Sequence, residues 1–134
     1  MPTISVVYTG GLRTEATHVA SGNTIITDAP KDNQGRGEAF SPSDLVCSAL
    51  ASCMATIMGI VAKRNNLAIE GTRMDVTKVM AADPRRIIEI VIDFYFPANT
   101  FNEKERTLLE NAARTCPVAL SLNPEIRQAV TFHF

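Results

Sequence analysis

The sequence predicts a single domain of mixed β-strands and α-helices that spans residues 1–134. Alternating apolar and polar residues near both ends of the chain indicate strands, whereas the middle holds a long segment without any charge, which is typical of a buried helix. A length of 134 residues suits one compact domain. A hydrophobic share of 46% excludes a disordered chain.

Composition excludes several classes of function. With 13 Lys and Arg against 14 Asp and Glu, the net charge of -1 leaves no basic surface, so no nucleic-acid partner is expected. The first five residues lack the basic and long apolar regions of a signal peptide. Three cysteines are an odd number without regular spacing, which argues against a secreted disulfide framework. We therefore expect a cytoplasmic protein with free thiols.

The first 39 residues are predicted to form three strands and a loop. Apolar residues alternate up to residue 8, and Gly10 and Gly11 can supply the positive φ angles of a hairpin turn. The return strand, residues 12–20, places Arg13, Glu15 and Thr17 on one face. A third strand is predicted over residues 24–28, and the glycines and prolines of 29–39 indicate a mobile loop.

The segment 45–62 carries no charge and is nearly long enough to span a membrane. Its start is typical of a helix, because Ser41 can cap it, Pro42 suits the first helical position and Asp44 completes a capping box. Many small and hydroxylated residues make it less hydrophobic than a membrane span. We expect a core helix with no membrane partner. Since so small a domain cannot cover a helix on all sides, a second copy should supply the remaining cover in a homodimer.

The C-terminal half is predicted to hold a hairpin, two helices and a last strand. Five apolar residues at every second position share one face of the second hairpin strand: Ile88, Ile90, Ile92, Phe94 and Phe96. A helix capped by Asn102 follows, and Cys116-Pro117 ends it and starts a short helix over 117–122. The last strand is expected at about residues 129–134.

Spacing alone does not assign a role to any cysteine. Cys47 and Cys53 lie on one helix about 120° apart, so they cannot pair or share a metal. A buried helix cysteine is usually a small apolar residue, and only a nearby cation would make Cys53 a thiolate. Cys116 stands at the start of a short helix, whose amides would favour a thiolate there. Neither histidine has metal-site spacing, so no metal is expected.

Two motifs resemble those of the OsmC/Ohr family, the osmotically inducible and organic hydroperoxide resistance proteins. The first runs from Glu38 through Ser41-Pro42 to Cys53, and the second is Thr115-Cys116-Pro117-Val118-Ala119. The resemblance implies an α+β fold with antiparallel sheets wrapped around a long buried central helix, in an intertwined homodimer with active sites at the subunit interface. It also implies a thiol peroxidase that prefers organic hydroperoxides.

The resemblance further implies which residues would act. Cys53 would be the peroxidatic cysteine and Cys116 the resolving one, with Arg13 as the activating arginine, although Arg13 could equally be a solvated strand residue. No bound cofactor is implied, and an external dithiol, of lipoyl type or another, would reduce the enzyme. The family has Glu directly after the helix-opening proline, where this chain has Ser43. Glu38 or Asp44 could replace that carboxylate.

The altered carboxylate leaves a second class of function open. The chain could be a non-catalytic, dimeric binding module that holds a small apolar ligand at the subunit interface. A redox sensor is a third reading, but nothing in the sequence resembles an output domain. In each of these readings Cys47 is an ordinary core residue.

Overall fold

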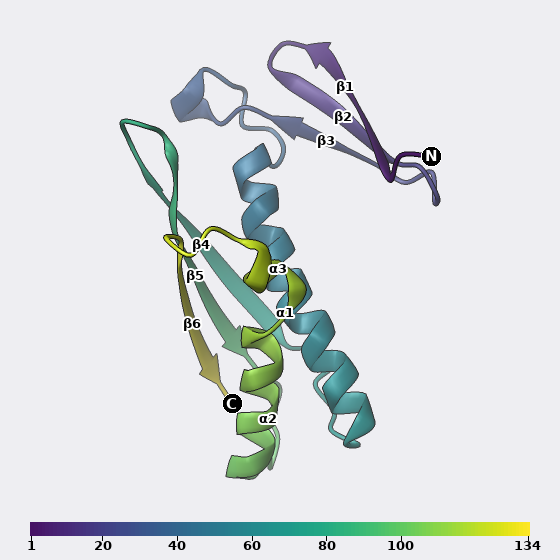
Figure 1. The fold of residues 1–134 in the computed structure, drawn as a ribbon, viewed down its shortest axis with the longest axis vertical. Coiled ribbons are helices and arrows are strands. Elements are labelled where there is room, and N and C mark those ends of the chain that lie inside the picture. Colours follow the sequence, from purple (N-terminus) through teal and green to yellow (C-terminus); the bar gives the residue numbers. More distant parts are fainter. The chain divides into compact units, whose positions relative to one another are not determined.

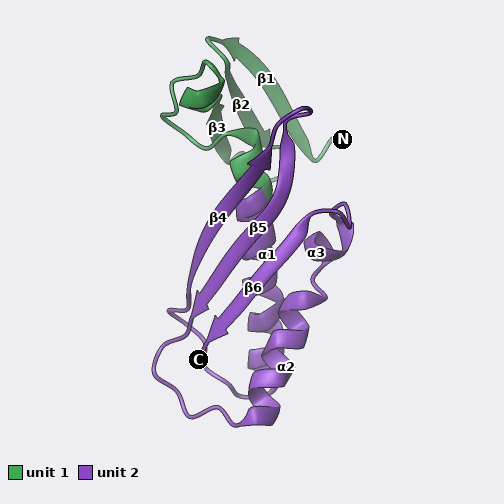
Figure 2. Ribbon diagram, turned by 90° about the vertical axis from the view of Figure 1, so that its left-hand side faces the viewer, with its two compact units in different colours: residues 1–46 green, residues 47–134 purple.

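The structure of the chain, a computed structural model, describes all of residues 1–134. It divides into two compact units, unit 1 (residues 1–46) and unit 2 (residues 47–134), which are coloured separately in Figure 2. Unit 1 contains β1 (Ile4–Gly10), β2 (Arg13–His18), β3 (Thr24–Asp28) and the short 3-10 helix η1 (Lys31–Asn33). Helix α1 (Pro42–Arg64) begins in unit 1 and continues through unit 2, followed there by β4 (Arg73–Ala81), β5 (Arg86–Tyr95), α2 (Glu103–Arg114), α3 (Pro117–Ser121) and β6 (Arg127–His133).

The three strands of unit 1 form an antiparallel sheet in the order β1-β2-β3. Gly10 and Gly11 adopt positive φ angles of 89° and 63° in the first turn, as the sequence predicts for a hairpin. The third strand has the predicted bounds, and the short turn before it fixes its pairing with β2. In this register Arg13 lies directly opposite Asp28.

Unit 1 buries polar side chains and exposes its apolar ones. Its buried side chains are Thr27, Asp28 and Ser41. Strand β1 and strand β3 expose large apolar side chains instead: Ile4, Val6, Val7, Tyr8, Ile25 and Ile26. The hydrogen bonds of the sheet and its loop, and not an apolar core, therefore hold this unit together.

Helix α1 begins with the predicted capping box. The Ser41 hydroxyl accepts a hydrogen bond from the Asp44 amide at 3.1 Å, and an Asp44 carboxylate oxygen accepts one from the Ser41 amide at 2.9 Å. These two bonds satisfy amides that have no partner within the helix. The helix ends at Arg64, shortly before Asn66 turns the chain with a φ of 54°.

The sheet of unit 2 has the order β4-β5-β6 and is not antiparallel throughout. Strands β4 and β5 form the predicted antiparallel hairpin, but β6 pairs with β5 in parallel, so the expectation of antiparallel sheets is wrong for this pair. The physical reason is the long connection through α2 and α3, which carries the chain back along the sheet before β6 starts (Figure 1).

A β-bulge corrects one predicted strand face. The register between β4 and β5 shifts beside Val79 and Met80, so that Met80 pairs with Ile87. Ile87 packs against the core, whereas Ile88 is 36% exposed and does not share the face of Ile90. An extra residue in one strand reverses the alternation of the residues before it, which the periodicity alone does not reveal.

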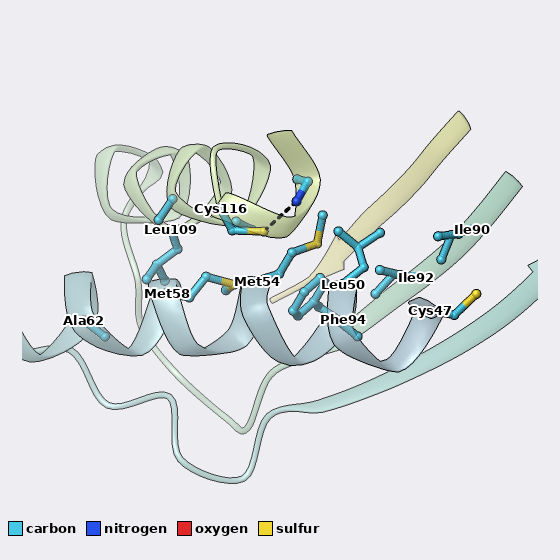
Figure 3. Close-up of a cluster of buried hydrophobic side chains, with 14 residues drawn as sticks. Cys47, Leu50, Met54, Met58, Ala62, Ile90, Ile92, Phe94, Leu109 and Cys116 are labelled. Atoms are coloured by element: carbon cyan, nitrogen blue, oxygen red, sulfur yellow. Dashed lines mark hydrogen bonds between the residues drawn. The ribbon is translucent and has the colours of Figure 1, made fainter. Parts of the chain in front are cut away.

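The core of unit 2 lies between α1, α2 and the sheet (Figure 3). One stripe of α1 is buried in it: Cys47, Leu50, Ala51, Met54, Met58 and Ala62. By length and composition alone α1 could also cross a membrane. Its buried stripe identifies it as a core helix, and Val46 and Ile60 remain exposed on other faces.

Candidate functional site

The predicted site residues form two groups, one in each unit. Cys53 and Cys116 come together in unit 2, and Arg13 and Glu38 come together in unit 1. All three cysteines of the chain are free thiols. No three His, Cys, Asp or Glu side chains are grouped so as to hold a metal ion.

Cys116 caps the short helix α3. Its Sγ accepts a hydrogen bond from the Ala119 amide at 3.4 Å, drawn as the dashed line in Figure 3, and Pro117 occupies the first turn of the helix. The thiol is completely buried among the core side chains that include Met54 and Leu109. The cap of α3 and the packing of the core therefore both fix the position of this sulfur.

Burial raises the pKa of the Cys116 thiol above its ordinary value, and the neighbouring Cys53 adds to the rise. The amides of Ala119 and Val118 lower the pKa, as expected at a helix start. Burial and the neighbouring Cys53 together outweigh these amides, so the net effect does not favour a thiolate at Cys116. Cys116 is a neutral thiol at neutral pH.

Cys53 lies in the middle of α1, half-buried, and packs against the core. Its side chain is a hydrogen-bonding neighbour of the Cys116 thiol. Two thiols in such contact can form a disulfide if one of them is first oxidised. Cys47, in contrast, is 3% exposed and lies among apolar side chains near Ile90 and Ile92 (Figure 3), as expected for a core residue.

In unit 1, the Arg13 guanidinium binds Asp28 with two parallel hydrogen bonds. Arg13 Nε donates to one carboxylate oxygen at 2.7 Å and Nη2 to the other at 2.9 Å. Glu38 reaches the same guanidinium less closely, at 3.9 Å from Nη2, and its side chain is 65% exposed. Arg13 is therefore a paired residue and not merely a solvated one.

Asp28 was missed by the sequence analysis, which considered only Glu38 and Asp44 as partners of Arg13. The hydrogen bonds from Arg13 hold the pKa of Asp28 below its ordinary value, and the Glu38 amide adds to this effect. The predicted bounds did not lead to it. A turn at residues 21–23 would set residue 20 opposite residue 24, whereas β2 ends at His18 in the structure, so that Thr17 pairs with Thr24 and Arg13 with Asp28.

The fold and the paired thiols define a small α+β protein with two neighbouring cysteines on separate helices. The family model described as OsmC-like protein matches residues 35–130, which is most of the chain. The chain belongs to the OsmC-like family.

Solved structures support this assignment. A protein of Psychrobacter arcticus 273-4, provisionally described as an osmotic stress induced and detoxification response protein, is 53% identical, with a TM-score of 0.95 over 99% of this chain and 96% of that one. An OsmC-like protein of Mycoplasma pneumoniae is 20% identical, with a TM-score of 0.80 over 97% and 94% of the two chains. The organic hydroperoxide resistance protein OsmC of Legionella pneumophila is 15% identical, with a TM-score of 0.77 over 98% and 95%.

The last two similarities show a common fold and nothing finer, because their sequence identities are low. No curated protein matches the chain significantly in sequence. The chemistry of this chain therefore follows from its own residues.

Proposed function

We propose that this chain is a cysteine-based peroxidase that reduces organic hydroperoxides. The observation that carries the proposal is the contact between a half-buried thiol, Cys53, and a buried thiol, Cys116. A peroxidase of this kind needs one sulfur that substrate can reach and a second that can trap its oxidised form. The half-buried Cys53 suits the first role, and the buried Cys116 suits the second.

In the first step the Cys53 thiolate attacks the distal oxygen of the peroxide. The O–O bond breaks, and the alkoxide takes up a proton and leaves as an alcohol, while Cys53 becomes a sulfenic acid. The family resemblance assigns to Arg13 the hydrogen bond to the peroxide that stabilises the negative charge on the leaving oxygen. The peroxide is reduced by two electrons, which Cys53 supplies.

In the second step Cys116 attacks the sulfenic sulfur of Cys53. The S–S bond forms, and the sulfenic oxygen leaves with the proton of Cys116 as water. A raised pKa keeps that proton on Cys116 until this step, so the buried sulfur does not carry a charge in the resting protein. An external dithiol, of lipoyl type or another, then reduces the disulfide by thiol exchange and becomes oxidised itself. This cycle needs no bound cofactor and suits a reducing compartment such as the cytoplasm.

We further propose that two copies of the chain form a homodimer. On α1 an exposed stripe of small residues, with Ala49, Ser52 and Thr56 beside Gly59, would let a second helix approach closely. A methyl group built on Gly59 would meet no atom within 4 Å. The exposed apolar side chains of β1 and β3 also favour cover by a second copy, since large exposed apolar surfaces mark interaction sites.

Intact mass spectrometry tests the chemistry directly. One equivalent of cumene hydroperoxide should remove two hydrogens from the reduced protein as the disulfide forms. Cys116→Ser should instead gain one oxygen at Cys53, and Cys53→Ser should not react. Cys47→Ser is the matched control among the cysteines and should behave as the wild type does. A wild-type protein whose mass stays unchanged would overturn the proposal and favour a dimeric module that binds a small apolar ligand.

Substrate preference provides a second test. The partly buried apolar side chain of Ile57, one helical turn from Cys53 on α1, should favour an organic hydroperoxide over hydrogen peroxide at this thiol. The second-order rate constant for cumene hydroperoxide should therefore exceed that for hydrogen peroxide, measured by stopped-flow competition. A faster reaction with hydrogen peroxide would contradict the preference for organic substrates without affecting the thiol chemistry.

A further inference from the structure

We infer that Asp28 is the positioning residue for Arg13: it fixes the guanidinium on one edge so that Nη1 is left to meet the peroxide. This inference rests on the proposed function for its catalytic meaning, but its structural basis lies wholly within unit 1. The role would be that of the carboxylate that Ser43 cannot supply.

The hydrogen bonds between Arg13 and Asp28 fix the orientation of the guanidinium. Because Nε and Nη2 both donate to the same carboxylate, at 2.7 and 2.9 Å, the two planar groups are held in one geometry. The structure shows no hydrogen bond or ion pair at Nη1 of Arg13. The Arg13 side chain is 27% exposed, and Nη1 is the guanidinium nitrogen without a bond to Asp28 or Glu38.

Asp28 is itself held on several sides. Its carboxylate accepts a hydrogen bond from the Glu38 amide at 3.1 Å, and its own amide donates to the Phe40 carbonyl at 3.0 Å. The side chain is 1% exposed. Because Asp28 is buried and is bound to the end of the loop through both its carboxylate and its amide, its carboxylate can hold another side chain in one orientation.

The neighbouring carboxylates do not meet these conditions. Glu38 is 65% exposed, and the 3.9 Å between its carboxylate and Nη2 of Arg13 makes a contact that solvent screens. Asp44 accepts the Ser41 amide in the cap of α1. Ser43 has a hydroxyl that lies 3.2 Å from the Ser41 hydroxyl. Only Asp28 combines burial, charge and a bidentate contact with Arg13.

Kinetics of Cys53 oxidation by cumene hydroperoxide test the inference in the full-length protein. Asp28→Asn should lower the second-order rate constant about tenfold or more, the effect typical of losing an orienting partner. Glu38→Gln is the matched control, since it removes a carboxylate beside the same guanidinium, and it should change the rate less than about twofold.

A double-mutant cycle separates positioning from a general effect on the fold. If Asp28 acts through Arg13, Asp28→Asn should have no further effect on the rate in an Arg13→Ala background. An equal loss in both backgrounds would overturn the inference, as would a Glu38→Gln variant that is as slow as Asp28→Asn.

Hydrogen exchange at Arg13 Nε, followed by NMR, gives a readout that does not depend on activity. The Nε proton should be protected in the wild type and in Glu38→Gln, and unprotected in Asp28→Asn. If Asp28→Asn does not fold, titration of the wild type replaces it, and protection should disappear as Asp28 becomes protonated in acid. An unprotected proton in the wild type refutes the inference, whereas a wild type that forms no disulfide refutes the proposed function alone.

Discussion

The side chains buried in unit 1 are Thr27, Asp28 and Ser41, all polar, whereas every side chain buried in unit 2 is apolar. Apolar burial supplies most of the favourable free energy of folding, and hydrogen bonds to charged groups supply direction. Unit 2 therefore carries its own core and places two thiols inside it. Unit 1 fixes the orientation of the Arg13 guanidinium, and the large apolar side chains of its strands β1 and β3 stay exposed.

The largest expected effect concerns the core of unit 2. Leu109 is completely buried on α2, so Leu109→Ala should lower the free energy of unfolding by about 2–5 kcal/mol, measured by urea denaturation. Leu120 on α3 is 71% exposed, and Leu120→Ala should stay within about 0.5 kcal/mol of the wild type. Similar losses for both variants would show that apolar burial does not set the stability of this unit.

The next effect concerns the exposed apolar face of unit 1. Val6 is 59% exposed, and Val6→Asp should raise the dissociation constant of the proposed homodimer at least about tenfold, which corresponds to about 1.4 kcal/mol. A charge buried at an interface without a partner is unfavourable. Sedimentation equilibrium would measure the constant, and Val6→Thr, which keeps the branched shape, is the control. A monomeric wild type, or an unchanged constant in Val6→Asp, would mean that another surface covers this face.

The smallest effect is a pH dependence confined to unit 1. The folded-state pKa of Asp28 is lowered by Arg13, so their pair stabilises the unit above the unfolded pKa of about 3.9 and loses its effect as the pH falls through the folded value. The protection factors of the Thr14 and Thr27 amides, which are corrected for the intrinsic exchange rate at each pH, should therefore fall in acid in the wild type. Asp28→Asn should lack this acid response, and the Leu109 amide of unit 2 serves as the internal control. If Asp28→Asn showed the same acid response as the wild type, a titratable group other than Asp28 would cause that response.

Local signals in the sequence predicted local structure well. The strand 24–28 has its predicted bounds, and the cap formed by Ser41 and Asp44 was predicted from residue types at fixed spacing. The exposure of Ile88 and the parallel pairing of β6 were not predicted, because both depend on how distant strands meet. The periodicity of one strand does not reveal a bulge in its pairing with the neighbouring strand.

The candidate site shows the same limit. The contact between Cys53 and Cys116 joins distant parts of the chain, and only the resemblance to a family pointed to it. Asp28 departs from the family pattern that directed attention to Ser43 and its neighbours. Its pairing with Arg13 depends on a strand register that the predicted turn at residues 21–23 does not give, and a resemblance that names one carboxylate position does not draw attention to another.

The parallel pairing of β6 with β5 has a consequence for the order of folding. Strands β4 and β5 can pair through a short turn, whereas β6 can pair only after α2 and α3 have crossed back over the sheet. Contacts between residues distant in sequence form slowly, because the chain between them must first be ordered. Cys116 lies in that crossing segment, so its sulfur meets Cys53 only when the crossover has packed. The proposed disulfide between the two thiols therefore depends on the packing of this crossover and not on the pairing of the β4–β5 hairpin.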